Sequence, residues 1–579
     1  MEYTLDRFAQ QVRDAIAATG QVPAASIELA TPKPSIPADL AFPAFRAAKE
    51  LGMPPPQLAQ HLASQIAPAG LIGSVAAAGP FLNFAIDPVA LTAAVLDEID
   101  TRGALYGADD HGTGKTIVVD YSAPNIAKRM HVGHIRSTII GQSIVNIMRA
   151  NGYTVVGDNH LGDWGKQFGS IIAAVMRYGE PQAQDETALE QFEAIYTRYS
   201  AEMKAALEQG DTALDDEARA WSLRLEQGDP AARALWQRTI DLTMGINQKL
   251  YDRLGVQIDH AYGESFYEPM LDGVIAEALD TGVAYRDENG AVVVAEIEEK
   301  LPTFLLQRSD GGTLYHTRDV ATIKFRVSEF NPDRIIYVVG APQELHFRQL
   351  FALMRAMGYA VADRCVHIAT GTVFDQHGQA LSTRRGNMIY LEALLDEATS
   401  RARAVVDQAS KDLTEAEKIA IAEQVGIGAV VYNDLYQDVR RNITLDWDRM
   451  LSLEGNSAPY IQYMHARCRS ILRRAATEGL RADGGDSALL THPSELALIK
   501  TLAKLPAAVR EAAERYAPAV IAEWCYDTAR AVSAFYRDCP VLKGDNLTLN
   551  RARLRLTAAA ATALTSGLAL LGIRAPAQM

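Results

Sequence analysis

The segment from residue 116 to residue 150 constrains the fold of this chain more than any other. The apolar run Ile117-Val118-Val119 predicts a short buried strand, and apolar residues at helical spacing predict a helix over residues 135–148. The turn between them contains His131-Val132-Gly133-His134. A buried strand that leads through such a turn into a helix is typical of an open α/β sheet, whose ligands bind at the carboxyl ends of its strands. We therefore expect a doubly wound parallel sheet with a ligand site at this turn.

The start of the predicted helix suits a nucleotide. His131 and His134 fall on its first turn, and Gly133 between them allows a ligand to approach closely. Unpaired N–H groups and the positive end of the helix dipole favour phosphate at such a position. We expect these residues to bind the phosphates or the ribose of ATP. Since a four-residue pattern often occurs by chance, the surrounding sequence has to support this interpretation.

The length of 579 residues suits about four domains. Residues 153–158 and 334–340 predict further strands of the sheet, and the polar, acidic stretch 180–255 predicts helices inserted between its two halves. The units that we expect, in chain order, are an α+β N-terminal domain at 1–105, a parallel-sheet domain at 106–375 with an insertion at about 178–300, a helical linker at 376–454 and an all-helical domain at 455–579.

Longer motifs surround the two histidines. They are Ser-Ala-Pro-Asn-Ile-Ala-Lys at 122–128, Asn-His-Leu-Gly-Asp-Trp-Gly at 159–165 and Tyr-Gly-Glu-Ser-Phe-Tyr at 262–267. Together they resemble the arginyl-tRNA synthetases, class I aminoacyl-tRNA synthetases whose first signature reads His-Ile-Gly-His. The resemblance implies arginine–tRNA ligase activity: ATP activates L-arginine to arginyl-adenylate with release of pyrophosphate, and arginine then passes to the 3′-terminal ribose of tRNA(Arg). It also implies a Rossmann-type catalytic domain, an N-terminal domain that contacts tRNA and a helical C-terminal domain that binds the anticodon.

The resemblance assigns the ATP site to His131, Gly133 and His134, with Asp163 as a further candidate. The second class I signature normally reads Lys-Met-Ser-Lys-Ser, but the matching segment here, residues 380–387, contains neither lysine. Ser382 and Arg384 are the ATP-binding candidates in that segment. Lys128, just before the first signature, resembles the lysine that substitutes for the missing function in this family, since its compact ammonium can approach a phosphate as a point charge. We expect Mg²⁺ to accompany ATP and no tightly held protein metal site.

Arginine recognition requires acidic groups, because a carboxylate accepts paired hydrogen bonds from a planar guanidinium. Tyr315 and Asp319 are four residues apart and fall on one helical face. The resemblance adds three further arginine-binding residues, Asp120, Asn125 and Gln343. Either aspartate would take the guanidinium or the α-amino group, and the sequence leaves this assignment open. A site built on such hydrogen bonds rejects lysine strongly, so we expect no editing domain.

The C-terminal region is the part of the chain that best suits RNA. The whole chain is acidic, with 71 Asp and Glu against 56 Lys and Arg, but residues 455–579 contain 16 basic and 10 acidic residues. Unpaired anticodon bases stack on aromatic side chains, and basic side chains hold the backbone. The tRNA-binding candidates are Tyr460, Tyr463 and Arg467.

Composition bounds the cellular setting. The chain has no run of about 18 apolar residues that would predict a membrane-spanning helix. Its four cysteines show no C-x-x-C spacing and indicate reduced thiols, so we expect a cytoplasmic protein, monomeric as is usual in the family. Two alternatives remain: a catalytically inactive paralogue that binds tRNA, and a nucleotidyltransferase with the same first signature that acts on a small acid without RNA.

Overall fold

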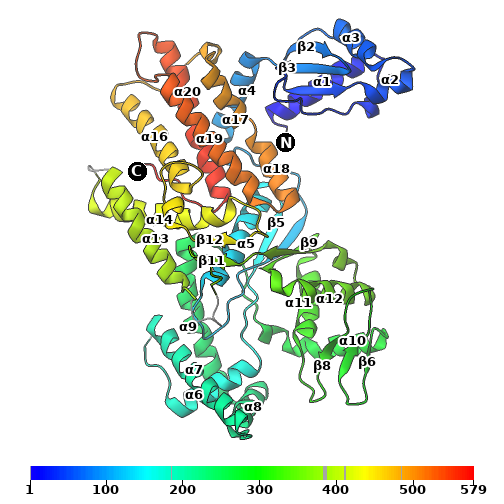
Figure 1. The fold of residues 1–579 in the computed structure, drawn as a ribbon, viewed down its shortest axis with the longest axis vertical. Coiled ribbons are helices and arrows are strands. Elements are labelled where there is room, and N and C mark those ends of the chain that lie inside the picture. Colours follow the sequence, from blue (N-terminus) through cyan, green and yellow to red (C-terminus); the bar gives the residue numbers. More distant parts are fainter. Residues whose placement is uncertain (1, 184–185, 382–387, 410–412, 484) are drawn as a thin grey trace.

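The computed structural model describes residues 2–183, 186–381, 388–409, 413–483 and 485–579. A small N-terminal unit lies beside a bundle of long helices, and a parallel sheet lies between this bundle and two lobes at the opposite end of the molecule (Figure 1). Every helix within the described ranges is too short or too polar to cross a lipid bilayer.

The central sheet has the order β10-β9-β4-β5, and all its strands are parallel. The strands are β4 (Thr116–Asp120), β5 (Thr154–Asp158), β9 (Arg334–Gly340) and β10 (Cys365–Thr370). This confirms the predicted fold class and the strands expected at 117–119, 153–158 and 334–340. The chain moves from β4 to one side and later returns to its other side at β9, so the order reverses between these strands. Ligands of open α/β sheets bind at such a switch point.

Both faces of the sheet are covered, which explains its unbroken apolar strands. Successive side chains point to opposite faces. Ile117 and Val119 of β4 pack into the core shared with α5 (Val132–Ala150) and the C-terminal helices, whereas Val118 packs into the core of one lobe. Helix α5 is longer than the predicted 135–148 because His131 caps it at its N-terminus.

The N-terminal unit contains α1 (Thr4–Ala18), α2 (Phe45–Leu51) and α3 (Pro55–Gln65) around an antiparallel sheet, and α4 (Pro88–Arg102) follows it and packs against the bundle of long helices (Figure 1). Its strands are β1 (Leu40–Pro43), β2 (Ile72–Ala78) and β3 (Phe81–Ile86), in the order β1-β3-β2. Strands β2 and β3 pair as an antiparallel hairpin. The chain turns at Gly79, whose φ of 57° lies in the left-handed region that glycine adopts without strain.

Two lobes follow the first half of the sheet (Figure 1). One is helical, as predicted, and comprises α6 (Lys166–Tyr178), α7 (Glu186–Glu208), α8 (Ala213–Glu226) and α9 (Pro230–Leu254). The other contains α10 (Leu271–Asp280), α11 (Tyr315–Phe330) and α12 (Glu344–Ala356) beside a short antiparallel sheet of β6 (Ala284–Arg286), β7 (Val292–Val294) and β8 (Phe304–Gln307).

The rest of the chain is chiefly helical, as expected. After the short parallel pair of β11 (Val373–Phe374) and β12 (Ile443–Thr444), the helices are α13 (Leu391–Ala409), α14 (Glu415–Leu435), α15 (Trp447–Met450), α16 (Ala458–Thr477), α17 (Pro493–Leu502), α18 (Leu505–Arg515), α19 (Pro518–Asp538) and α20 (Leu547–Leu570). The four cysteines are free thiols.

A buried ion pair joins the sheet domain to these helices. Arg136 on α5 donates from Nε and Nη2 to Asp434 on α14, at 2.8–3.1 Å, and both side chains are almost wholly buried. The guanidinium also donates to the carbonyl oxygens of Val439 and Arg441, at 3.1 and 2.8 Å. A buried charge of this kind is stable only while its partner is present.

We expect Arg136→Ala to lower the free energy of unfolding by about 3–5 kcal/mol, because it leaves the Asp434 carboxylate buried without its counter-ion. Chemical denaturation measures the effect. The control is Arg149→Ala on the same helix, where the partner Asp259 is partly exposed and the expected loss is at most about 1 kcal/mol. Equal losses in the two variants would show that the buried pair of Arg136 and Asp434 stabilises the protein no more than the partly exposed pair of Arg149 and Asp259.

Candidate active site

The turn between β4 and α5 is held in an unusual backbone conformation. Ser122, Ala123 and Ala127 have φ values of 74°, 51° and 61°, in the left-handed region that residues other than glycine rarely adopt. Two side chains stabilise it: Asn159 Oδ1 accepts from the Ala123 N–H at 2.9 Å, and Thr243 Oγ1 accepts from the Ala127 N–H at 3.1 Å. Strain of this kind persists only where the surrounding structure stabilises it, and it is concentrated at functional sites.

The two signature histidines form a capped and stacked pair. His131 Nδ1 accepts from the Gly133 N–H, His134 Nδ1 accepts from the His131 N–H, each at 3.1 Å, and the ring centroids are 3.9 Å apart. A nitrogen that accepts a hydrogen bond carries no proton, so each neutral ring has its proton on Nε2. The pair therefore presents two N–H donors at the N-terminus of α5. A Cβ at Gly133 would lie 2.8 Å from His131 Cε1, so the glycine makes room for this ring.

Burial keeps these rings neutral. Burial lowers the pKa of His134 to about 3 and also lowers the pKa of His131. Lys128 lies beside them, with Nζ 5.5 Å from the centroid of the Tyr196 ring, and burial lowers its pKa against the opposing effect of Glu193. The histidines can thus act at neutral pH as hydrogen-bond donors without charge.

Ser382 and Arg384, the candidates in the second signature, lie outside the described residues. The segment that follows it contacts the first signature. The Val132 N–H donates to the Ile389 carbonyl at 3.0 Å, and the Leu391 N–H donates to the Met130 carbonyl at 2.9 Å. Any displacement of the segment around residue 390 therefore reaches the start of α5 through the backbone.

Glu193 on α7 connects three segments, a feature that no sequence motif indicated. Its carboxylate accepts from the backbone N–H and the Nε of Arg129, at 2.7 and 3.1 Å, and from the Tyr390 hydroxyl at 3.1 Å. The Arg129 guanidinium lies 3.5 Å from the centroid of the Tyr390 ring. The helical lobe, the loop before α5 and the segment after the second signature thus meet at one carboxylate.

Asp120, an expected arginine-binding residue, is paired within the chain. Asp120 and Asp158 are register partners at the ends of β4 and β5, and Arg326 Nη2 lies 2.6 Å from Oδ2 of each. Burial raises the pKa of Asp120, although Arg326 acts to lower it. Its carboxylate therefore already holds one guanidinium. No sequence pattern indicated this pairing, because Arg326 belongs to no recognised motif.

The other arginine candidates surround the switch point. Tyr315, the first residue of α11, is 65% exposed, and Asp319 follows one turn later. His346 Nε2 lies 2.5 Å from Asp319 Oδ2, and this hydrogen bond outweighs burial and lowers the pKa of Asp319. Gln343 is exposed at the end of the turn after β9. Asn125 is exposed and lies close to Gly162. A Cβ atom at Gly162 would be 2.7 Å from the Asn125 Oδ1.

The motif residues beyond β5 form a second polar layer. Asp163 accepts from the N–H and hydroxyl of Ser265, at 3.0 and 2.6 Å, so its carboxylate fixes the turn at 263–265. Glu264 pairs with Arg318 at 3.2 Å, and burial raises the pKa of Glu264. Among the described residues, His160 Nδ1 is a buried polar atom without a partner. The motifs at 159–165 and 262–267 indicated this region, but not the roles of Glu264 and Arg318.

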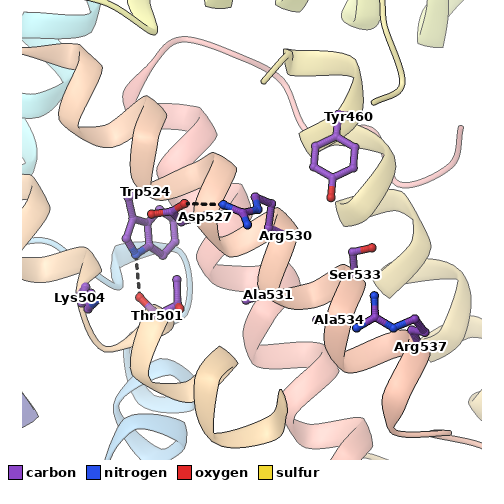
Figure 2. Close-up of a pocket in the computed structure, with 10 residues that line it drawn as sticks. All are labelled: Tyr460, Thr501, Lys504, Trp524, Asp527, Arg530, Ala531, Ser533, Ala534 and Arg537. Atoms are coloured by element: carbon purple, nitrogen blue, oxygen red, sulfur yellow. Dashed lines mark hydrogen bonds and ion pairs between the residues drawn. The ribbon is translucent and has the colours of Figure 1, made fainter. Parts of the chain in front are cut away.

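The three tRNA candidates lie on α16 but line two different cavities. Figure 2 shows Tyr460 directed toward Ser533 on α19, in a cavity of about 570 Å³ that Arg530, Arg537 and Lys504 also line. Tyr463 and Arg467 line a second cavity, of about 680 Å³. There Arg467 donates to the Tyr463 hydroxyl at 2.9 Å and lies 3.9 Å from the centroid of the Tyr536 ring. Both cavities combine aromatic rings with cations, a chemistry suited to single-stranded nucleic acid.

Comparisons with known proteins agree with this geometry. The model of the class I (R) tRNA synthetase catalytic domain matches residues 97–447, the DALR anticodon-binding domain matches 461–579, and the arginyl-tRNA synthetase N-terminal domain matches 6–86. An arginine–tRNA ligase of Chloroflexus aggregans is 62% identical over 581 residues, covering 100% of both chains. One of Clostridium perfringens is 38% identical, covering 94% of both.

Among solved structures, the arginyl-tRNA synthetase of Thermus thermophilus superimposes with a TM-score of 0.81 at 26% identity, covering 98% of this chain and 100% of its own. The similarity thus extends over the whole length at the level of both sequence and fold. It confirms the resemblance found in the motifs: the chain belongs to the arginyl-tRNA synthetase family.

Proposed function

We propose that this chain is an arginine–tRNA ligase, which forms arginyl-adenylate from L-arginine and ATP and transfers arginine to the 3′-terminal ribose of tRNA(Arg). One observation carries the proposal: the first signature is intact, and its two imidazoles present paired Nε2 donors at the N-terminus of α5. Relatives named arginine–tRNA ligase match the full chain and support it. An inactive paralogue has no need to keep such a donor pair.

The first reaction step builds negative charge on phosphate oxygens, which favours donors arranged in advance. His131 and His134 would donate from Nε2 to these oxygens, and the dipole of α5 adds to their effect. Lys128 would supply the positive charge that the second signature lacks. We expect Mg²⁺ to accompany ATP and to share the negative charge of its phosphates.

The substrate guanidinium would bind Asp319. This carboxylate is partly exposed, and only its Oδ2 is engaged, by His346, among the described residues. Asp120 uses Oδ2 for Arg326, which leaves Oδ1 for the α-amino group of the substrate. Asn125 and Gln343 would fix the substrate carboxylate or amine, and Tyr315 would cover the side chain. Two acids thus take two different groups of one amino acid.

The tRNA would bind along the C-terminal helices. Tyr460 and Tyr463 would stack on anticodon bases and Arg467 would contact a phosphate, since each lines a cavity that contains other cations or aromatic rings. We further propose that the protein acts as a cytoplasmic monomer.

Arginine-dependent exchange between ATP and pyrophosphate, with and without tRNA(Arg), tests the proposed function. Exchange that requires tRNA supports the ligase and a site completed by tRNA. Exchange without tRNA, followed by aminoacylation, would support the ligase but contradict a requirement for tRNA in activation. Exchange without tRNA and without aminoacylation would favour the nucleotidyltransferase. A folded protein without exchange under either condition would favour the inactive paralogue.

His134→Ala removes one of the two donors, and we expect exchange to slow by about 10²–10³-fold, as for other preorganised donors in water-excluded sites. Steady-state kinetics at saturating arginine measures the loss. His61→Ala, on the surface of the N-terminal unit, is the control and should retain the wild-type rate. A His134→Ala variant with more than a tenth of the wild-type rate would contradict the donor role.

The neutral state of His134 also predicts a pH effect on stability. With a pKa of about 3 in the folded protein and an ordinary value of 6.5, the residue binds a proton only in the unfolded chain between these values, so stability falls as the pH falls through this window. Between pH 7 and pH 5, wild type should lose about 2 kcal/mol more than His134→Asn. Urea denaturation at both pH values measures the difference, and parallel losses would show that His134 is not buried in its neutral form.

Asp319→Asn should raise the KM for arginine by about 30- to 1000-fold, because the guanidinium loses its charged partner, while the KM for ATP stays within about threefold. Aminoacylation kinetics separates the two constants. Asp310→Asn is the matched control, since Asp310 lies on the surface, where it pairs with Arg308 and accepts from the Gly312 N–H. An unchanged KM for arginine would assign the guanidinium to another acid.

A further inference from the structure

The bond between His346 and Asp319 connects two helices of one lobe. His346 lies on the first turn of α12 and Asp319 on the second turn of α11, and their side chains are 19% and 23% exposed. Nε2 of the imidazole is 2.5 Å from Oδ2 of the carboxylate. Oδ1 of Asp319 has no partner among the described residues. One oxygen is thus fixed by the protein, and the other remains for a ligand.

Ring contacts hold His346 in place. The centroids of His346 and His316 are 4.3 Å apart, and His316 in turn lies 4.3 Å from Phe304. Phe347 contacts His346 edge-on, with centroids 5.5 Å apart. Burial lowers the pKa of His316 to about 4, so this neighbour packs as a neutral ring. An imidazole confined on these sides keeps its Nε2 directed at Asp319.

We propose that His346 is a positioning residue for arginine recognition: as a neutral donor it orients a fully charged Asp319, and its protonation weakens arginine binding. The inference rests on the proposed function, in which Asp319 binds the guanidinium. A neutral His346 donates one hydrogen bond and leaves the charge of Asp319 intact. A protonated His346 neutralises Asp319 and puts a second cation beside the guanidinium.

The hydrogen-bonded pair lies among charged and titratable groups from several elements. His346 lies in the first turn of α12, where the positive end of the helix dipole disfavours a cation. The titratable and charged groups around the pair are Asp319, His316 and Arg318 from α11, Glu344 from α12, Tyr337 from β9, His367 from β10, His160 from the loop after β5 and Glu264 from the loop before α10. Because the imidazole of His346 is the titratable group that contacts Asp319 directly, arginine binding should weaken on acidification.

The KM for arginine in aminoacylation of tRNA(Arg), measured from pH 6 to pH 8, tests the inference. In wild type it should rise severalfold as the pH falls. His346→Gln keeps a neutral N–H donor but cannot be protonated, so its KM should stay near the wild-type value at pH 8 and should change less on acidification. His346→Leu removes the donor and should raise the KM for arginine about 10- to 100-fold at pH 8, with kcat and the KM for ATP changed less than threefold.

His367→Gln is the matched control, because His367 stacks on Phe347 in the same ring cluster but bonds to the Val339 carbonyl and not to Asp319. It should keep the wild-type pH dependence. Equal pH dependence in wild type and His346→Gln would overturn the inference while leaving the ligase intact. Wild type inactive at pH 8 would overturn the proposed function itself, and with it the inference. If His346→Leu does not fold, His346→Gln alone decides.

Discussion

A single buried guanidinium makes the active-site edge of the sheet possible. Strands β4 and β5 end side by side in Asp120 and Asp158, and Arg326, which has no exposed surface, binds both carboxylates at 2.6 Å. Two buried acids in register would otherwise repel each other at high cost. Since β4 leads into the strained turn before α5, and β5 leads to the Asn159 that stabilises this turn, the placement of the signature histidines depends on the same pairing.

Around this edge, some polar side chains are neutral hydrogen-bond donors, and charged side chains lie next to them. His131 and His134 are neutral donors at the start of α5, and the ammonium of Lys128 lies beside them. On α12, His346 holds one oxygen of Asp319, and the other oxygen has no partner among the described residues. A charged ligand such as a guanidinium or a triphosphate must bind reversibly. Neutral groups suit this better than further charges, because they orient the ligand and do not themselves pair with the side chain that carries the opposite charge.

The contacts of Glu193 explain how distant parts of the chain can act on the same site. This residue joins the helical lobe to Arg129, which precedes the signature, and to Tyr390, which follows the second signature. On the other side of α5, Arg136 binds Asp434 and the carbonyl oxygens of residues 439 and 441, in the region that leads to the C-terminal helices. The helical lobe, α14 and the segment around residue 390 therefore all contact α5 or the loop that precedes it.

The sequence by itself determined the elements and the family. The apolar runs at 117–119 and 334–340, the periodicity of α5 and the motifs around His131 and Tyr262 depend on neighbours close in the chain, and the structure has the strands and helix that they predict. The expected site residues come from those motifs, and their roles stay predictions. Tertiary structure alone decided that Arg326, 206 residues from Asp120, takes its carboxylate, that His346 meets Asp319 and that Tyr460 and Tyr463 line separate cavities. Local patterns fix backbone conformation and burial, but the partner of a buried charge depends on which distant segments pack against it, and no local pattern specifies that.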